Sequence, residues 1–356
     1  MTTLQLKTIT KNFIHELELA GSQATSSLPY ISHTLPTVSN VSEDEVFQVI
    51  VVGGTVFRSA RCSMKNGQVE VLSTFREDIP RFQTKADFIA CMRKFVHTDV
   101  HQLALNFAYP LEPVFENGIL DGKLVSGSKE NDFNGMINEK VGQLIRDDLQ
   151  KFRGQSLQVS CANDTVCLLL SGLTTYKSQE LFGGIVGTGV NFAFFTGDRT
   201  LVNLESANFD RFPISEAAKY IDRDSIRSGQ ALFEKEVAGA YLYQHYNFVI
   251  EQKKLAYPLL ARTAELGEIA KKDDVSGEIA RNVLDHSASL VACQIAGIAE
   301  FKKRNIVGIM EGSLFWKGHN YKTLVETYLG LLTEYRVTFT KIDDDSILGA
   351  AYLLGD

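Results

Sequence analysis

The sequence predicts a protein of two α/β domains, and three observations lead to this prediction. The chain has 356 residues, whereas one domain usually takes about 100 to 200. Apolar runs typical of strands alternate with segments of helical periodicity, an order that is typical of layered α/β folds. Both halves of the chain also open with a strand, a glycine turn and a second strand, at residues 46–62 and 183–195. This doubling indicates two related domains.

The first half of the chain begins with a predicted helix at residues 4–19, where apolar residues recur at helical spacing. A segment rich in Ser, Thr and Pro follows up to residue 40 and is predicted to be irregular. A glycine turn and an Asn-Gly turn then divide residues 46–75 into three strands. The remaining segments of this half are predicted as helix, strand, amphipathic helix and strand, in the order 86–96, 103–111, 138–152 and 157–162.

The second half begins with three strands between residues 183 and 209. Its longest predicted helix covers residues 277–303, where an apolar stripe is spaced for one helix face. The other predicted elements of this half are, in order, a helix at 228–243, a strand and turn at 305–315, a helix at 321–335, a strand at 337–342 and a final helix from residue 346.

Composition and charge exclude several classes of protein. The chain is 44% hydrophobic and 22% charged, which suits a large globular core. A formal net charge of −7 with scattered Lys and Arg argues against binding to nucleic acid or to an anionic membrane surface. We find no apolar run of the roughly 18 to 20 residues that span a bilayer, and the first residues lack a signal-peptide core. The expected location is the cytoplasm, and the sequence contains no indication of an oligomeric state.

Cysteine and histidine spacing predicts no metal held by the protein. The five Cys form no C-x-x-C pair, so neither a disulfide framework nor a structural zinc site is indicated. The seven His are dispersed, and none has the H-x-x-x-H spacing that places two ligands on one helix face. We therefore predict no metal-ligating residues.

Two glycine-and-threonine turns have the composition of a phosphate site. They are VVGGTVF, at Gly53 to Thr55, and IVGTGVN, at Gly187 to Gly189. Glycine allows close approach of the backbone, successive N–H groups form an anion nest, and the Thr hydroxyl adds a donor. Either turn alone is also ordinary hairpin chemistry. Neither is a P-loop or a dinucleotide-binding turn.

The stretch SCANDTVCLLLSG sets Asn163 and Asp164 before an apolar run. Asn and Asp at such a place are typical helix caps, because their side-chain oxygens accept the free N–H groups of the first turn. The other interpretation is a general base at a domain junction. The two roles are compatible, and the residues alone leave both open.

The order of these motifs resembles the hexokinase family, within the actin-like ATPase superfold, from Val46 to the C-terminus. The resemblance implies a two-domain, ribonuclease H-like α/β fold with an interdomain cleft, and ATP and Mg²⁺ as cofactors. VVGGTVFR resembles the first phosphate motif of the family, VGTGVN the second, and GIMEGSLF the adenosine segment. The residues implied for nucleotide binding are Gly53, Gly54, Thr55, Arg58, Gly187, Thr188, Gly189, Gly312 and Ser313.

The same resemblance implies a hexose site. CANDTV is similar to the family motif whose Asp, here Asp164, takes the proton from the sugar 6-hydroxyl. LVSGSKEND is similar to the segment that touches sugar and phosphate, which implies a catalytic role for Lys129, although a charged loop is the ordinary place for a lysine. NFAYPLE resembles the sugar-side strand. The residues implied for hexose binding are Ser128, Asn163, Asn191, Glu205 and Glu234. The two Glu could instead be solvated surface charges.

Several positions depart from the family pattern. Val51 stands where the family carries an Asp that holds magnesium through water, and valine coordinates nothing. Val56 replaces an Asn after the Thr, and Ala108 replaces the sugar-side Ser. Met310 and Glu311 differ from the adenosine segment. These departures imply weaker magnesium organisation, an altered sugar, or a loss of catalysis with binding retained.

We therefore predict a smaller domain at residues 46–162, joined by a returning C-terminal helix at 343–356. The larger domain takes residues 163–342 and the N-terminal segment 1–45, with Asp164 at the junction. The predicted activity is that of an ATP-dependent hexokinase, which forms hexose 6-phosphate in glycolysis and uses Asp164 as general base. The alternative is a catalytically weak, sugar-binding regulator or sensor. A third class, a chaperone-like or filament-forming ATPase, has no supporting motif.

Overall fold

The structure divides into two compact units, and the chain crosses from one unit to the other within two of its strands. The computed structural model describes residues 1–53, 56–78, 81–127 and 131–355. Unit 1 consists of Met1–Tyr30, Gly184–Phe192 and Leu204–Thr340. Unit 2 contains the described residues of 31–183, 193–203 and 341–355. The domain boundary at residue 162 remains a prediction.

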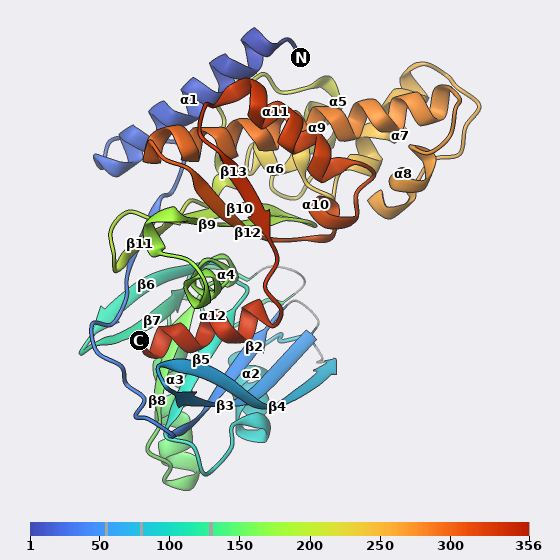
Figure 1. Ribbon diagram of the computed structural model, residues 1–356. Helices are drawn as coiled ribbons and strands as arrows, with labels where there is room; N and C mark the ends of the chain where they lie inside the picture. Colours follow the sequence, from blue (N-terminus) through green and yellow to red (C-terminus); the bar gives the residue numbers. More distant parts are fainter. Residues whose placement is uncertain (54–55, 79–80, 128–130, 356) are drawn as a thin grey trace. The chain divides into compact units, whose positions relative to one another are not determined.

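Unit 1 is mostly helical, and its helices α1, α9 and α11 pack against one another (Figure 1). Helix α1 begins with a capping box, in which the Thr2 side chain accepts from Gln5 N and the Gln5 side chain accepts from Thr2 N. At Gly297 of α9 a Cβ would lie 2.5 Å from the Phe13 ring, so glycine permits close packing of α1 on α9. The helices are α1 (Thr3–Gly21), η3 (Ser206–Asn208), α5 (Glu216–Arg223), α6 (Leu232–Val237), α7 (Leu242–Gln252), α8 (Thr263–Ile269), α9 (Val275–Lys302), α10 (Ser313–Lys317) and α11 (Tyr321–Leu332).

A six-stranded sheet has the order β1-β11-β10-β9-β12-β13. Its middle strands, β9 (Leu181–Val186) and β10 (Val190–Phe195), are those in which the chain changes unit. Unit 1 contributes β12 (Ile306–Glu311) and β13 (Val337–Thr340), which are parallel. Unit 2 contributes β1 (Ile31–Thr34) and β11 (Thr200–Asn203), which are antiparallel.

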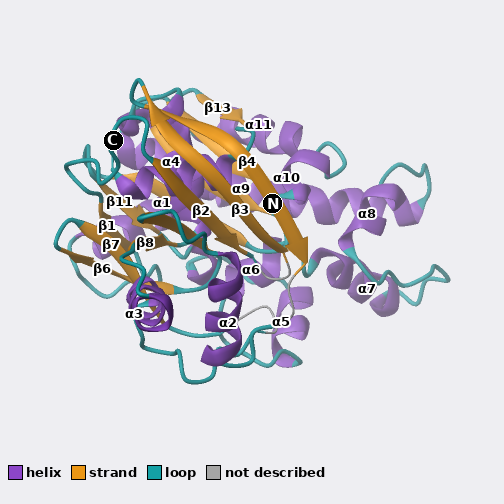
Figure 2. Ribbon diagram, turned by 90° about the horizontal axis from the view of Figure 1, so that it is seen from below, coloured by secondary structure: helices purple, strands orange, loops and turns teal. Residues whose placement is uncertain are grey.

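Unit 2 is built on a five-stranded sheet of order β4-β3-β2-β5-β8, whose strands β2, β3 and β4 lie side by side in Figure 2. A hairpin of β6 and β7 is a separate two-stranded sheet. The strands are β2 (Val46–Val52), β3 (Val56–Lys65), β4 (Gln68–Asp78), β5 (Gln102–Phe107), β6 (Leu111–Glu116), β7 (Ile119–Leu124) and β8 (Gln158–Ala162). The helices are α2 (Lys85–Phe95), α3 (Val141–Arg153), α4 (Asp164–Ser171), η1 (Gly172–Thr174), η2 (Ser178–Glu180), α12 (Asp345–Ala351) and η4 (Tyr352–Leu354).

The two faces of the five-stranded sheet meet different helices. Alternate strand residues such as Ile50, Leu105 and Cys161 join one apolar core with residues of α2 and α3. Helix α12 packs against β2, β5 and α4. At Gly349 of α12 a Cβ would lie 1.7 Å from the carbonyl oxygen of Cys167, so only glycine allows this approach of α12 to α4. The start of α4, where Asp164 lies, is therefore fixed by close packing.

Strand β1 and the segment 228–243 differ from the sequence prediction because tertiary contacts decide them. Strand β1 lies within the segment that was predicted to be irregular, and it forms by pairing with β11. The single helix predicted at 228–243 is two helices, α6 and α7. Between them Gly239 N and Ala240 N donate to the carbonyl oxygens of Gly187 and Thr188, and these donors cannot also continue a helix. No described helix has the length and apolarity that crossing a membrane requires.

Candidate active site

Asn163 and Asp164 begin helix α4 in unit 2. Asn163 is the N-cap residue, and its Oδ1 accepts a hydrogen bond from Thr165 N at 3.0 Å. Asp164 Oδ1 accepts from the same N–H at 2.8 Å. Asn163 is only 7% exposed, whereas Asp164 is half-buried. The capping role is therefore present, and it fixes the orientation of the Asp164 carboxylate at a partly accessible position.

The first glycine turn follows β2, and the structure describes its first residue. Gly53 is half-buried, and its carbonyl oxygen accepts a hydrogen bond from Tyr109 Oη at 2.9 Å. The predicted nucleotide-binding residues Gly54 and Thr55 lie outside the described residues, as do Ser128 and Lys129, to which the sequence assigned sugar and phosphate contacts.

Arg58, near the start of β3, is engaged by the N-terminal end of α12. Its Nη1 donates to Ser346 Oγ at 3.1 Å, and its Nη2 forms an ion pair with Asp344. The Arg58 side chain is 29% exposed and that of Asp344 45% exposed, so the pair is open to water. A nucleotide phosphate that binds Arg58 would compete with Asp344 for the guanidinium.

Val51 stands where the family pattern has a magnesium-associated Asp, so this position offers no carboxylate, although its cross-strand neighbours are polar. Val51 is in register with Arg58 of β3 and with Asn106 of β5. Asn106 Nδ2 donates to Ser346 O at 3.2 Å, and its buried Oδ1 has no hydrogen-bond partner among the described residues. Mg²⁺ in proteins is usually held by one or two carboxylates together with substrate phosphates. Among the described residues no group of three or more His, Cys, Asp or Glu could hold a metal ion. Val51 itself therefore offers magnesium no ligand.

The second glycine turn, in unit 1, is packed tightly against two other predicted site segments. A Cβ at Gly187 would lie 3.1 Å from Gly312 Cα, and a Cβ at Gly189 would lie 2.6 Å from Glu234 Oε2. Val190 N donates to the same Glu234 oxygen at 3.2 Å. These contacts leave little room for a side chain at positions 187 and 189, which explains the two glycines of this turn. Predicted nucleotide-binding and sugar-binding residues come together here.

A hydrogen bond between the Asn191 side chain and the backbone of Ser206 brings Asn191 close to Glu205 in the fold. Asn191 Oδ1 accepts hydrogen bonds from Phe192 N at 2.8 Å and from Ser206 N at 3.2 Å. Glu205 precedes Ser206 and has a φ of 48°, a left-handed conformation that is uncommon outside glycine. Helix α6, which carries Glu234, packs against η3 directly after Glu205. The three polar residues predicted to bind the hexose in unit 1 therefore belong to one neighbourhood.

Helix α6 is anchored by the two charged residues that follow Glu234. Lys235 is 3% exposed and forms an ion pair with Asp222. Glu236 is fully buried, and it accepts hydrogen bonds from His286 Nε2 at 2.7 Å and from Ser215 N at 3.0 Å. Buried charges of this kind need such partners. These contacts hold the short helix α6 in place. Glu234, which lies on this helix, is half-buried.

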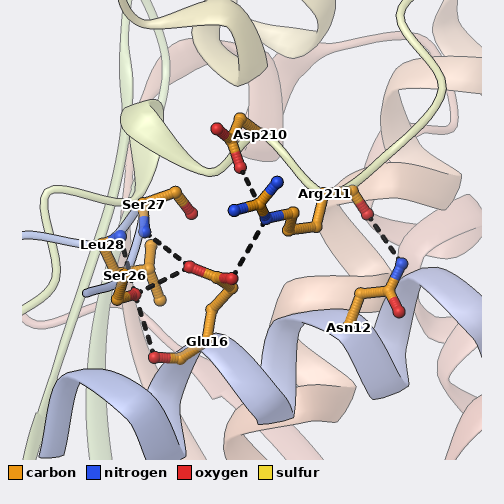
Figure 3. A network of polar contacts seen from close by, with 7 residues as sticks. All are labelled: Asn12, Glu16, Ser26, Ser27, Leu28, Asp210 and Arg211. Carbon is orange, nitrogen blue, oxygen red and sulfur yellow. Dashed lines mark hydrogen bonds and ion pairs between the residues drawn. The ribbon is translucent and has the colours of Figure 1, made fainter. Parts of the chain in front are cut away.

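A polar network joins α1 to the loop after Glu205, as Figure 3 shows. Glu16 is 2% exposed, and its carboxylate accepts from Ser26 Oγ at 2.8 Å, Ser27 N at 2.5 Å and Arg211 Nε at 3.2 Å. Asn12 Nδ2 donates to Arg211 O at 3.0 Å. Burial alone would raise the pKa of Glu16, but the hydrogen bonds from Ser27, Ser26 and Arg211 lower it below its ordinary value. The network holds this loop, which follows Glu205 in the chain, against helix α1.

Sequence reasoning missed these supporting residues. Tyr109, Glu16 and Lys235 are themselves buried, and each has a partner in another segment of the chain, so the local sequence does little to mark them. For Tyr109 the one signal was a hydroxyl-bearing aromatic at the end of an otherwise apolar strand, NFAYPL. A buried tyrosine hydroxyl usually has a hydrogen-bond partner, so a tyrosine at this place predicts a hydrogen bond inside the fold.

Comparison with known proteins gives consistent similarities. Two family models described as hexokinase match residues 1–174 and 252–355. Hexokinase-4, chloroplastic, from Oryza sativa subsp. japonica is 25% identical over an alignment of 421 positions, which includes 94% of this chain and 81% of that protein. A Schistosoma mansoni hexokinase complexed with glucose superposes with a TM-score of 0.80 at 20% identity, covering 99% of this chain and 95% of that chain. A ROK family glucokinase from Streptomyces griseus, in complex with glucose and AMPPNP, gives 0.56 at 16% identity, covering 86% and 98%.

Proposed function

This chain belongs to the hexokinase family of sugar kinases, and we propose that it transfers the γ-phosphoryl group of ATP to the 6-hydroxyl of a hexose such as glucose. The observation that carries the proposal is the gathering of Asn191, Glu205 and Glu234 beside the glycine turn at 187–189. Fixed carboxylates and amides recognise a sugar by several hydrogen bonds at once, and a glycine turn suits phosphate.

Asp164 is the proposed general base. Its carboxylate would accept the proton of the 6-hydroxyl while the hydroxyl oxygen bonds to the γ-phosphorus and the bond from that phosphorus to the β-phosphate oxygen breaks, releasing ADP. Such transfer needs little covalent chemistry from the protein beyond positioning and charge stabilisation. Thr165 N fixes one carboxylate oxygen at 2.8 Å, which keeps the base in one orientation. Asn163 is proposed to bind a neighbouring sugar hydroxyl.

The nucleotide is proposed to meet the backbone of both glycine turns, with Gly312 and Ser313 beside its adenosine. Ser128 and Lys129 keep their predicted roles on sugar and phosphate. Arg58 would exchange Asp344 for a phosphate oxygen. Magnesium is expected from the family resemblance and would neutralise charge on the phosphates. The cytoplasmic location also remains a prediction.

The test is a coupled ADP-release assay with glucose, ATP and magnesium in the buffer. The parent should turn over only with glucose present. Asp164→Asn should lose about 10²- to 10⁴-fold in turnover, the usual contribution of a general base, while glucose binding by calorimetry persists. Asp147→Asn is the matched control, because Asp147 is a 61% exposed acid on α3 of the same unit. A parent that releases no ADP with any common hexose would contradict the proposal.

A second candidate function, a sugar-binding regulator or sensor without turnover, is favoured by Val51, which replaces the magnesium-associated Asp of the family pattern. Calorimetry would then detect glucose binding by a parent that releases no ADP. Val51→Asp is the discriminating variant, since its carboxylate would lie in register with Arg58 and Asn106. Turnover restored by Val51→Asp would identify a descendant that lost catalysis at this position.

A further inference from the structure

Helix α6, which carries the predicted hexose-binding residue Glu234, depends on contacts from other parts of unit 1. It has only 6 residues, and isolated helices of this length are not stable in water. Its N-cap residue is Ala231, whose φ is 49° and whose methyl side chain accepts no hydrogen bond. The direction of the Glu234 side chain is therefore set by the contacts that hold this helix.

Two consecutive residues of helix α9 hold the C-terminal half of α6. His286 Nε2 donates to Glu236 Oε1 at 2.7 Å, and Ser287 Oγ donates to Val237 O at 2.7 Å. Ser287 is fully buried, and Tyr321 Oη of α11 lies 2.6 Å from its hydroxyl oxygen. Helix α9 has 28 residues and packs against α1 and α11. The two hydrogen bonds therefore tie a short helix to a large helical core.

The hydrogen bond from His286 to Glu236 is the stronger of the two. Burial acts to raise the pKa of Glu236, but the hydrogen bond from His286 and the nearby His245 bring this pKa below its ordinary value. Glu236 is therefore an ionised carboxylate in the neutral range, and hydrogen bonds to ionised groups are roughly twice as strong as neutral ones. The His286 side chain is 30% exposed, so it can be replaced without opening a large cavity.

Glu234 points away from the side of α6 that α9 holds. Successive residues of a helix are about 100° apart, so Glu234 and Glu236 point to nearly opposite sides. Glu234 Oε2 accepts from Val190 N at 3.2 Å, and a Cβ at Gly189 would lie 2.6 Å from the same oxygen. A tilt of α6 would either break the bond to Val190 or press the carboxylate against the glycine turn. The Glu234 carboxylate thus has little freedom as long as α9 holds the opposite side.

We propose that His286, supported by Ser287, is a positioning residue for hexose recognition, which fixes α6 through Glu236 and so directs the Glu234 carboxylate. This inference rests on the proposed function, because it takes Glu234 as a ligand of the sugar hydroxyls. It gives helix α9 a part in sugar affinity that requires no contact between His286 and the sugar.

The test is a double-mutant cycle on glucose binding, followed by NMR titration without nucleotide, which also detects weak binding. A hydrogen bond to a charged group corresponds to about tenfold or more in an equilibrium constant. A misdirected Glu234 loses part of such a bond, so His286→Ala should raise the glucose dissociation constant by about three- to tenfold. His286→Gln keeps an N–H donor and should stay within about twofold of the parent. In a Glu234→Ala background, His286→Ala should change the constant by less than about twofold, because the group that it directs is absent.

Ser287→Ala is a milder second variant, which serves if His286→Ala does not fold. It removes one neutral hydrogen bond and should raise the glucose dissociation constant by about two- to threefold. The matched control is Tyr328→Phe, which removes a hydroxyl that donates to the carboxylate of Asp285, the residue before His286, at 2.7 and 2.8 Å. All three variants are expected to lower the thermal midpoint, but the control should leave glucose affinity unchanged.

Unchanged glucose affinity in both His286→Ala and Ser287→Ala would overturn the inference. A loss of the same size in the Glu234→Ala background would overturn it too, because it would show a general loosening of unit 1. Binding is measured without turnover, so a parent that binds glucose but releases no ADP contradicts the proposed activity alone. A parent that binds no glucose contradicts both.

Discussion

Gly312 is a position where alanine should be strongly destabilising. Its φ is +115°, and an added Cβ would lie 2.1 Å from Val186 O and 2.7 Å from Gly187 N. These are backbone atoms of β9 and the second glycine turn, so they cannot rotate away. An unfavourable backbone region costs about 1 to 2 kcal/mol, and overpacking typically adds about 1 to 3 kcal/mol. Gly312→Ala should therefore lower the free energy of unfolding of unit 1 by about 2 to 5 kcal/mol.

Gly330 provides the control with the opposite sign. It is exposed in the last turn of helix α11, and an added Cβ would meet nothing within 4 Å. Alanine is favoured over glycine in a helix interior by about 1 kcal/mol. Gly330→Ala should therefore raise the stability of the same unit by about that amount.

Urea unfolding followed by tryptophan fluorescence separates the two variants. The chain has one Trp, which is Trp316 of α10, and its Nε1 donates to Met310 O at 2.9 Å. The probe therefore lies in unit 1, close to Gly312 in the chain. We expect the midpoint to fall for Gly312→Ala and to rise for Gly330→Ala. A Gly312→Ala midpoint equal to that of the parent would refute the argument that this backbone contact admits only glycine.

Two further predictions concern charges near the site. Asp344→Asn should lower the KM for ATP by up to about fivefold, because the Arg58 guanidinium loses a competing carboxylate. The limit is the energy of an exposed ion pair. A raised KM in steady-state kinetics would contradict this prediction. The lowered pKa of Glu16 gives stability that is fully present above its ordinary value of 4.5 and is lost as the pH falls through the lower folded value. In Glu16→Gln the thermal midpoint should therefore fall less steeply than in the parent between about pH 5 and pH 3. Thermal scans in which the two proteins lose the same number of degrees over this range would contradict the role given to Glu16.

Long elements with a strong local pattern could be predicted from the sequence. The apolar stripe at 277–303 marks α9, found at Val275–Lys302, and the strands predicted on either side of the two glycine turns are β2, β3, β9 and β10. Strand β1 and the hairpin of β6 and β7 were not predicted. The pairing of β1 with β11 joins residues far apart in the chain. The hairpin does have a local signal, Asn117-Gly118, whose φ angles of 53° and 77° suit a tight turn.

The candidate site was predictable only where motif order pointed to it. Asn163 and Asp164 stand together as an ordinary capping pattern, and only the resemblance gave the carboxylate a chemical role. The meeting of Asn191, Glu205 and Glu234 depends on long-range contacts, such as Val190 N to Glu234 Oε2. The supports supplied by Glu16, Tyr109 and Lys235 arise from burial beside distant partners, which a local pattern does not encode.

The most direct measurement of the central claim is phosphorus NMR of the products formed by the parent from glucose and ATP, with Asp164→Asn in parallel. We predict a phosphate ester on the 6-hydroxyl together with an equal amount of ADP, and neither product from Asp164→Asn at the same time point. ADP without a sugar phosphate would instead identify an ATPase. Glucose binding with neither product would identify a sensor, and either result would contradict the assignment of this chain as a hexose kinase that uses Asp164 as its base.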